Sequence, residues 1–209
     1  APDIRAEVRW VYALDRLAVE YQHEFIISEH PNKAKVWLEE IITRRIKNIG
    51  HAPQTISPNV GVQEWFHPEG RSEIITLNYT LDKGVSGSLS DASITCKDNA
   101  ILDAISSKAI KLWPRDSITV VSRTKEIKWK NDASHTFFAS ASKNPRLTVK
   151  VPDCLDYDLK FLSRHQPGLR HLGSGVYALD GILLPQQAIR FRWWEKAELE
   201  AWRNCGKAT

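Results

Sequence analysis

The second half of the chain is a succession of short segments in which apolar and polar residues alternate, with proline, glycine or aspartate in the stretches between them. These segments are 118–130, 135–140, 146–151, 157–162, 175–184 and 188–194. A period of two places one apolar face against a core, and the separating residues favour turns. Regular spacing of this kind predicts an antiparallel sandwich or an open barrel.

The N-terminal residues predict a hairpin. Residues 6–14 and 17–27 alternate in the same way on either side of Asp15 and Arg16. A two-residue turn would bring the two apolar faces together and would place Val8 opposite His23.

A change from alternation to helical spacing sets residues 32–49 apart, and Gly50 stands where such a helix would stop. Its apolar residues are Ala34, Trp37, Leu38, Ile41, Ile42, Ile46 and Ile49. Residues 98–112 fit a helix or a strand, and we favour a short helix that ends before Pro114. Another short helix is predicted at 195–205. We therefore expect an α+β fold, mainly antiparallel β, with one long helix packed on the sheet.

Composition places the chain among ordinary globular proteins, with 42% hydrophobic and 26% charged residues in 209. No apolar run approaches the roughly 20 residues that span a bilayer. We expect residues 1–209 to form a single β-rich domain without membrane contact. The absence of methionine and the abrupt start predict a piece of a larger protein, and three widely spaced cysteines favour the cytoplasm. Nothing in the sequence predicts the oligomeric state.

Asp116, Glu126 and Lys128 have an order of acid, spacer and Glu-x-Lys that resembles the restriction-endonuclease-like nucleases. In that family two carboxylates hold Mg²⁺ and a lysine steadies the attacking water. The resemblance covers under a tenth of the chain. An extended strand would separate Asp116 from Glu126 by about 30 Å, too far for one metal ion. The apolar phase changes near 123–125, which predicts a bulge or turn, but no turn residue there brings the carboxylates together.

Other catalytic groups lack a supporting pattern. Glu39 or Glu40 is the further acid that a nuclease would use. His23 is a candidate base, but no serine or cysteine in a nucleophile turn accompanies it. The cysteines and histidines lack the paired spacing of a zinc site. We expect no catalytic residue, no metal and no cofactor.

The segment IRFRWWEK, residues 189–196, gives the candidate ligand site. Alternation puts Ile189, Phe191 and Trp193 on one face, which we expect to be core, and arginines on the other. Guanidinium groups beside an aromatic ring suit a phosphate or a nucleobase, although a plain solvent face is the simpler alternative. The predicted ligand residues are Arg190, Arg192, Trp194, Arg164, Arg170 and His171.

These observations favour a non-enzymatic recognition or sensor module of a cytoplasmic signalling or defence protein. We expect it to bind a small anionic, nucleotide-like ligand or a protein partner. A Mg²⁺-dependent nuclease is one alternative. A nucleic-acid-binding domain that uses Arg190 and Arg192 is the other, although a net charge of +4 is small for that role.

Overall fold

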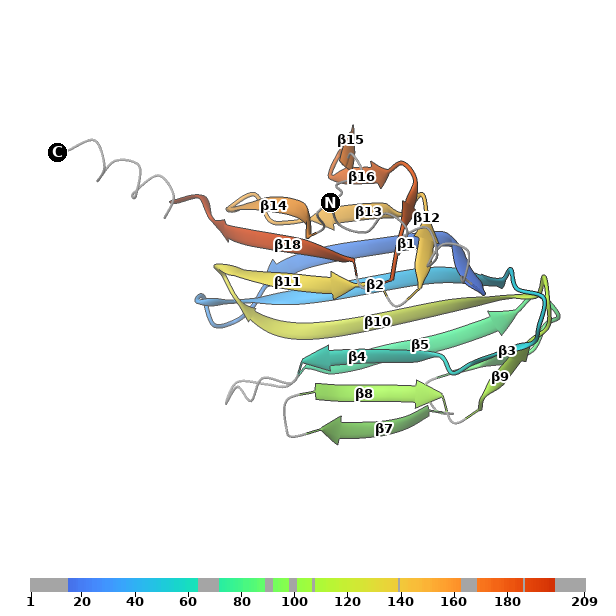
Figure 1. The fold of residues 1–209 in the computed structure, drawn as a ribbon. Coiled ribbons are helices and arrows are strands. Elements are labelled where there is room, and N and C mark those ends of the chain that lie inside the picture. Colours follow the sequence, from blue (N-terminus) through green and yellow to red (C-terminus); the bar gives the residue numbers. More distant parts are fainter. Residues whose placement is uncertain are drawn as a thin grey trace.

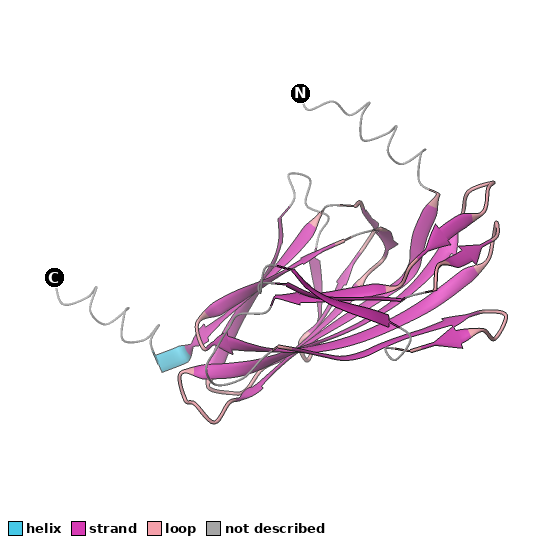
Figure 2. Cartoon of the chain, turned by 90° about the horizontal axis from the view of Figure 1, so that it is seen from below, coloured by secondary structure: helices cyan, strands magenta, loops and turns pink. Residues whose placement is uncertain are grey.

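The computed structural model describes residues 15–63, 72–88, 92–97, 101–106, 108–138, 140–162, 169–185 and 187–197 of the chain. Nearly all of them lie in strands or in the turns between strands (Figure 2). Helical backbone within these ranges is confined to residues 196–197. The same ranges contain no helix of the length and apolar character needed to cross a membrane.

Four long strands form the centre of a ten-stranded sheet, the main sheet (Figure 1). In spatial order they are β1 (Arg16–Glu29), β2 (Lys35–Asn48), β10 (Ser117–Trp129) and β5 (Glu73–Leu81), each antiparallel to the next. The sheet is extended by β13 (Arg146–Lys150), β16 (Val176–Leu179) and β15 (Leu169–Gly173) on the β1 side and by β6 (Ser86–Gly87) beside β5. The remaining members are β12 (Ala141–Lys143), which pairs with β1, and β17 (Ile182–Leu183). Both β12 and β13 run parallel to β1.

Smaller sheets cover one face of the main sheet in two separate places (Figure 1). Over β1 and β2 lies a three-stranded sheet of β11 (Asp132–Phe137), β18 (Ala188–Glu195) and β14 (Leu155–Leu162), with β18 in the middle. Over β10 and β5 lies a second, of β4 (Asn59–Gln63), β8 (Ile101–Ser106) and β7 (Ala92–Lys97), with β8 in the middle. The pair β3 (Gln54–Ile56) and β9 (Ile110–Leu112) contributes to the same side.

The larger hydrophobic core lies under the sheet β11-β18-β14. Phe25, Phe191 and Trp193 are fully buried there, and the Phe191 ring centroid is 4.7 Å from that of Phe25 and 5.2 Å from that of Trp193. Trp193 donates its indole N–H to the carbonyl of Trp129 at 2.9 Å, so its polar atom is satisfied. The face predicted to be core in 188–194 is therefore confirmed.

The smaller core lies between β10, β5 and the sheets that contain β4 and β9. Leu77, Leu112 and Ile118 are buried at its centre. Asn48, at the end of β2, is buried as well, and its amide nitrogen donates to the carbonyls of Ala52 and Leu112, both at 2.9 Å. Because a buried amide must be hydrogen-bonded, this side chain joins the main sheet to β9.

The predicted long helix is wrong, because residues 35–48 form the strand β2. Leu38, Ile42 and Ile46 point inward at even positions, whereas Trp37 and Ile41 point to the outer face. Together they imitate the i, i+3, i+4 spacing of a helix. The fold is multi-sheet β rather than α+β.

The short helices and the hairpin also need correction. Residues 101–106 and 110–112 are strands, where Ile110 and Leu112 are buried on either side of exposed Lys111. Of the helix predicted at 195–205, the part beyond residue 197 lies outside the described residues. So does the first arm of the hairpin. The second arm is strand β1, but at His23 both of its edges are already paired, with β2 and β13.

Replacing Phe191 by alanine is expected to lower the free energy of unfolding by about 3–5 kcal/mol, because it opens a cavity among fully buried rings. The matched variant Arg192→Ala removes the neighbouring, exposed side chain of the same strand and is expected to change it by less than about 1 kcal/mol. Urea unfolding followed by tryptophan fluorescence measures both. Equal losses would contradict the assigned faces of β18.

Candidate ligand-binding groove

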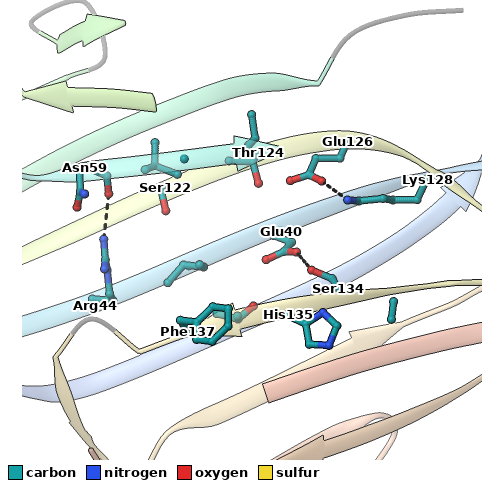
Figure 3. Close-up of a pocket in the computed structure, with 16 residues that line it drawn as sticks. Glu40, Arg44, Asn59, Ser122, Thr124, Glu126, Lys128, Ser134, His135 and Phe137 are labelled. Carbon is teal, nitrogen blue, oxygen red and sulfur yellow. Dashed lines mark hydrogen bonds and ion pairs between the residues drawn. The ribbon is translucent and has the colours of Figure 1, made fainter. Parts of the chain in front are cut away.

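A groove crosses the inner face of the main sheet where neither smaller sheet covers it (Figure 3). Strands β2 and β10 form its floor, the edge strand β4 forms one wall and the edge strand β11 forms the other. Its volume is about 570 Å³. The polar floor residues are Glu40, Arg44, Ser122, Thr124, Glu126 and Lys128. We call this site the β4–β11 groove.

The floor is polar because of the residues at inward positions of two paired strands. In the register of β2 and β10, Glu40 lies opposite Thr124 and Ile42 lies opposite Ser122. Alternate side chains of a strand share a face, so these residues continue the face that carries Leu38 and Ile46 into the cores. The inner face thus changes from apolar to polar and back along β2.

The irregularity predicted near residues 123–125 is present, but its extra residue belongs to the neighbouring strand. The pairing of β10 with β5 shifts between Arg123 and Thr124, which lie opposite Thr76 and Ile74 and leave Ile75 between them. Strand β10 itself keeps one inward face from end to end. The change of apolar phase in the sequence therefore marks the polar floor of the groove.

Glu40 has two side-chain partners at the groove. Its Oε2 is 2.9 Å from Nε2 of His23, and its Oε1 accepts a hydrogen bond from Oγ of Ser134 at 2.7 Å. Burial raises the pKa of the Glu40 carboxyl, but the hydrogen bonds from His23 and Ser134 and the charges of His23 and Lys128 outweigh it, so the pKa is lowered overall. The carboxylate fastens the wall strand β11 to the floor.

Arg44 fastens the other wall. It donates from a terminal guanidinium nitrogen to the backbone carbonyl of Asn59 in β4 at 3.2 Å. Its Nε is buried without a hydrogen-bond partner, in a side chain whose pKa burial lowers and the neighbouring Tyr21 raises in part. An unsatisfied donor on a cation is costly, so this nitrogen adds to the cost of burying the Arg44 side chain.

The two strand edges, which pair with no other described strand, present backbone groups to the groove. In β11, the N–H of Phe138 bonds to Gln187 beside the β11–β18 pair, and hydrogen-bonding residues alternate along such a pair. Thr136 therefore directs its backbone groups to β18, whereas His135 and Phe137 direct theirs to the free edge. Within the described part of the chain, the backbone amides of these two residues have no partner.

The same reasoning applies to β4. Ser106 donates its N–H to the carbonyl of Pro58, so Val60 turns its backbone groups to β8, while Asn59 and Gly61 turn theirs to the groove. The bond from Arg44 to the Asn59 carbonyl agrees with this assignment. The groove is thus bordered on both sides by strand edges that face it.

The structure does not bring the three nuclease residues together. Asp116 immediately precedes β10 and pairs with Lys83 at 3.0 Å, whereas Glu126 lies near the opposite end of this continuous strand. Glu126 and Lys128 lie in the groove, with Nζ of Lys128 2.6 Å from a carboxylate oxygen of Glu126. No group of three or more histidine, cysteine, aspartate or glutamate side chains that could hold a metal ion occurs in the described ranges.

One of the two glutamates considered as the further acid of a nuclease lies in the same groove as Glu126. Of the two glutamates considered, Glu40 lies in the groove, whereas Glu39 lies on the opposite face of the sheet and pairs with Arg123 at 2.7 Å. His23 is stacked on Phe25, with ring centroids 3.9 Å apart, and its side chain is 0% exposed. Ser134 bonds to the carboxylate rather than to the imidazole, so it is not arranged as an activated nucleophile.

The predicted arginine site is divided between two sheets. Arg190, Arg192 and Trp194 share the outer face of β18, where Arg192 lies 5.7 Å from the Trp194 ring. Arg190 faces a carboxylate of Asp158 at 4.0 Å, and this carboxylate would compete with an anionic ligand for the guanidinium group.

The residues from the preceding loop have other neighbours. In β15 of the main sheet, Arg170 pairs with Asp180 at 3.3 Å, and His171 packs on Tyr177 with ring centroids 4.7 Å apart. Arg164 lies outside the described residues. An anion site formed by the whole set stays a prediction.

Sequence reasoning missed the groove because its residues come from four separate strands. Ser122, Thr124, Arg44 and Ser134 belong to no motif. A signal was nevertheless present, since residues 117–130 and 35–48 each carry polar residues at positions where β-branched neighbours predict an inward face.

Comparison with known proteins does not place the chain in a family. No family model matches it, and no curated protein sequence matches it. Among solved structures, a "putative nutrient binding protein" from Legionella pneumophila subsp. pneumophila strain Philadelphia 1 aligns over 87% of this chain and 67% of its own length, with a TM-score of 0.49 and 9% identity.

Two further structures align less closely. A "putative protease" from Parabacteroides distasonis ATCC 8503 aligns over 85% of this chain, with a TM-score of 0.46 and 10% identity, and the chain spans only 40% of its length. The CBM3a-L domain of scaffoldin cipA from the Clostridium thermocellum cellulosome aligns over 52% of this chain and 69% of its own length, with a TM-score of 0.28 and 12% identity. Similarity at this level carries no activity over to the chain.

The lowered pKa of Glu40 predicts a pH-dependent contribution to stability. A depressed pKa in the folded state stabilises the protein above the ordinary value of 4.5, and this contribution is lost as pH falls from there through the folded-state value. In Glu40→Gln it is missing, so the difference in unfolding free energy between wild type and variant should shrink as pH falls below 4.5.

Urea unfolding at neutral pH and at a series of acidic values measures this difference. Glu39→Gln is the matched control, because it removes the adjacent carboxylate from the outer face of the same strand. Its free energy of unfolding is expected to fall with pH as that of the wild type does. A constant difference between wild type and Glu40→Gln across the series would contradict the assigned role of Glu40.

Proposed function

We propose that this chain is a non-catalytic recognition module that binds its ligand in the β4–β11 groove. The observation that carries this proposal is the polar floor between the two hydrophobic cores, with charged groups on the inner face of a sheet where apolar side chains would close the structure. Glu40 and Arg44 are already largely buried, and a sandwich that closed over them without a ligand would also remove the water that they still contact, at a further cost. A polar floor of this kind suits repeated exchange between water and a ligand.

The size and lining of the groove support a binding role. Its volume of about 570 Å³ falls within the roughly 300–1,000 Å³ of ligand pockets. Ser122 and Thr124 lie between the charges, and their largely buried hydroxyl groups keep the floor polar. Neither Ser134 nor His23 is arranged for catalysis, as described above, which favours binding over chemistry.

The charges of the floor favour a protein partner over a small anionic ligand. Two carboxylates, Glu40 and Glu126, lie beside the two cations Arg44 and Lys128, so the floor has no excess of positive charge. A compact phosphate would meet repulsion from both carboxylates. A polypeptide can instead present different side chains at different points. A cytoplasmic location and a role in signalling or defence stay predictions from the sequence.

Filling the groove tests the proposal. Thr124→Trp places a large ring on the floor, whereas Thr119→Trp places the same ring on the outer face of the same strand. The ¹⁵N-labelled wild type is titrated with nucleoside monophosphates, cyclic dinucleotides and sugar phosphates, and is used to select from a random decapeptide library. We expect at least one class of probe to shift amide resonances of β10 and β11, to bind Thr119→Trp equally well, and to lose about tenfold or more in affinity for Thr124→Trp.

Circular dichroism and thermal unfolding of both variants establish that each is folded. If a probe binds with shifts confined to other surfaces, or with equal affinity for both variants, or if no probe binds at all, the groove is not the ligand site and the proposal fails.

A further inference from the structure

The layer that covers the main sheet is interrupted at the groove. It consists of β7-β8-β4 on one side and β11-β18-β14 on the other, and both sheets end at the groove with an edge strand that pairs with no further strand in the described part of the chain (Figure 1). Unpaired edges are templates for pairing, and folded proteins usually block them with proline, lysine or a bulge. Strand β11, from Asp132 to Phe137, has none of these.

Backbone geometry makes β11 a template for an added strand. The N–H and C=O groups of His135 and Phe137 point to its free edge, and neither backbone amide has a partner among the described residues. At Ala133, the third outward position, the N–H is already taken by the Asp132 carboxylate at 2.8 Å. An added strand would therefore pair at His135 and Phe137, the two positions that lie along the groove.

We propose that the ligand is an extended segment of a protein partner that adds to β11 as an antiparallel strand and lies over the floor of the groove. This inference rests on the proposed function of the groove and names the class of ligand. Main-chain hydrogen bonds to His135 and Phe137 supply affinity, and alternate side chains of the segment supply specificity. Antiparallel pairing matches the other pairs of this small sheet.

The outward position of the segment is apolar. Phe137 is 68% exposed, and across the small sheet it lies in line with Ala188 and with Leu162, which is 46% exposed. A segment residue opposite Phe137 would share this outer face. Burying an aromatic ring against an aliphatic side chain across a strand pair is favourable, so leucine, isoleucine or valine fits there.

The next position of the segment is acidic. Thr136 points inward, and both it and Arg44 line the groove and the small cavity beside it. A segment residue opposite Thr136 therefore points to the floor near Arg44, whose Nε is buried without a partner. A carboxylate there would pair with the guanidinium charge, which a terminal nitrogen presents on the side of the Asn59 carbonyl.

The order of the two residues follows from the direction of pairing. Strand β11 passes Thr136 before Phe137, so an antiparallel segment meets Phe137 first and Thr136 second. In its own chain direction the segment therefore carries an apolar residue followed by an acidic one. The reversed order would point the carboxylate to the outer face.

Four decapeptides test this order of an apolar and an acidic residue on the wild-type protein. The first has leucine followed by aspartate at its centre, serine and threonine around them and a lysine at each end. The second exchanges the leucine and the aspartate, the third replaces the aspartate by asparagine, and the fourth is the first with an N-methyl group on the leucine amide. Fluorescence anisotropy measures affinity, and ¹⁵N spectra locate the contact.

The first peptide is expected to bind and to shift the amides of His135 and Phe137, and each of the other three to bind about tenfold or more weakly. Phe137→Ser, which removes an exposed ring, is expected to weaken the first peptide while leaving the unfolding transition nearly unchanged. Equal affinity for the exchanged or N-methylated peptide, or shifts that spare His135 and Phe137, would overturn strand addition.

Failure of strand addition is distinguishable from failure of the groove itself. If none of the four peptides binds, while a nucleotide or a library peptide with neither feature binds the wild type and not Thr124→Trp, the groove is a ligand site and the strand-addition code is wrong. If Thr124→Trp binds every probe as the wild type does, the proposed function is wrong as well.

Discussion

The inner face of β2 imposes the constraint on which the rest of the structure depends. Leu38 and Ile46 anchor two hydrophobic cores, and between them the same face carries Glu40 and Arg44. Charged groups resist burial unless they are paired and hydrogen-bonded. The covering layer therefore packs as two sheets, one over each apolar stretch, and stays open over the polar one.

The polar residues of β2 also hold the opening in place. Glu40 is bonded to Ser134 of one wall, and Arg44 is bonded to the Asn59 carbonyl of the other. Each wall is thus tied to the same floor strand by a charge-assisted hydrogen bond, which is among the stronger kinds in proteins. Because the walls are fixed relative to the floor, a ligand would meet preformed strand edges and would lose less conformational entropy on binding.

The sequence predicts the fold best where alternation is undisturbed and worst where the groove disturbs it. In 188–194, every inward residue is apolar, and the core face was correctly predicted. In 35–48, Glu40 and Arg44 replace apolar residues at inward positions, so the remaining apolar residues imitate a helix. In 117–130, the polar floor residues imitate a change of phase. Local rules fail here because the groove depends on contacts such as Glu40 with Ser134, which are 94 residues apart.

Amide hydrogen exchange of the free protein tests most directly whether the groove is open to a partner strand. Alternation along β11 predicts slow exchange at Ser134 and Thr136, whose amides face β18, and fast exchange at His135 and Phe137, whose amides face the groove. If His135 and Phe137 were protected as strongly as Ser134 and Thr136, the edge would already be paired in the free protein. The groove could then not be the open binding site that we propose.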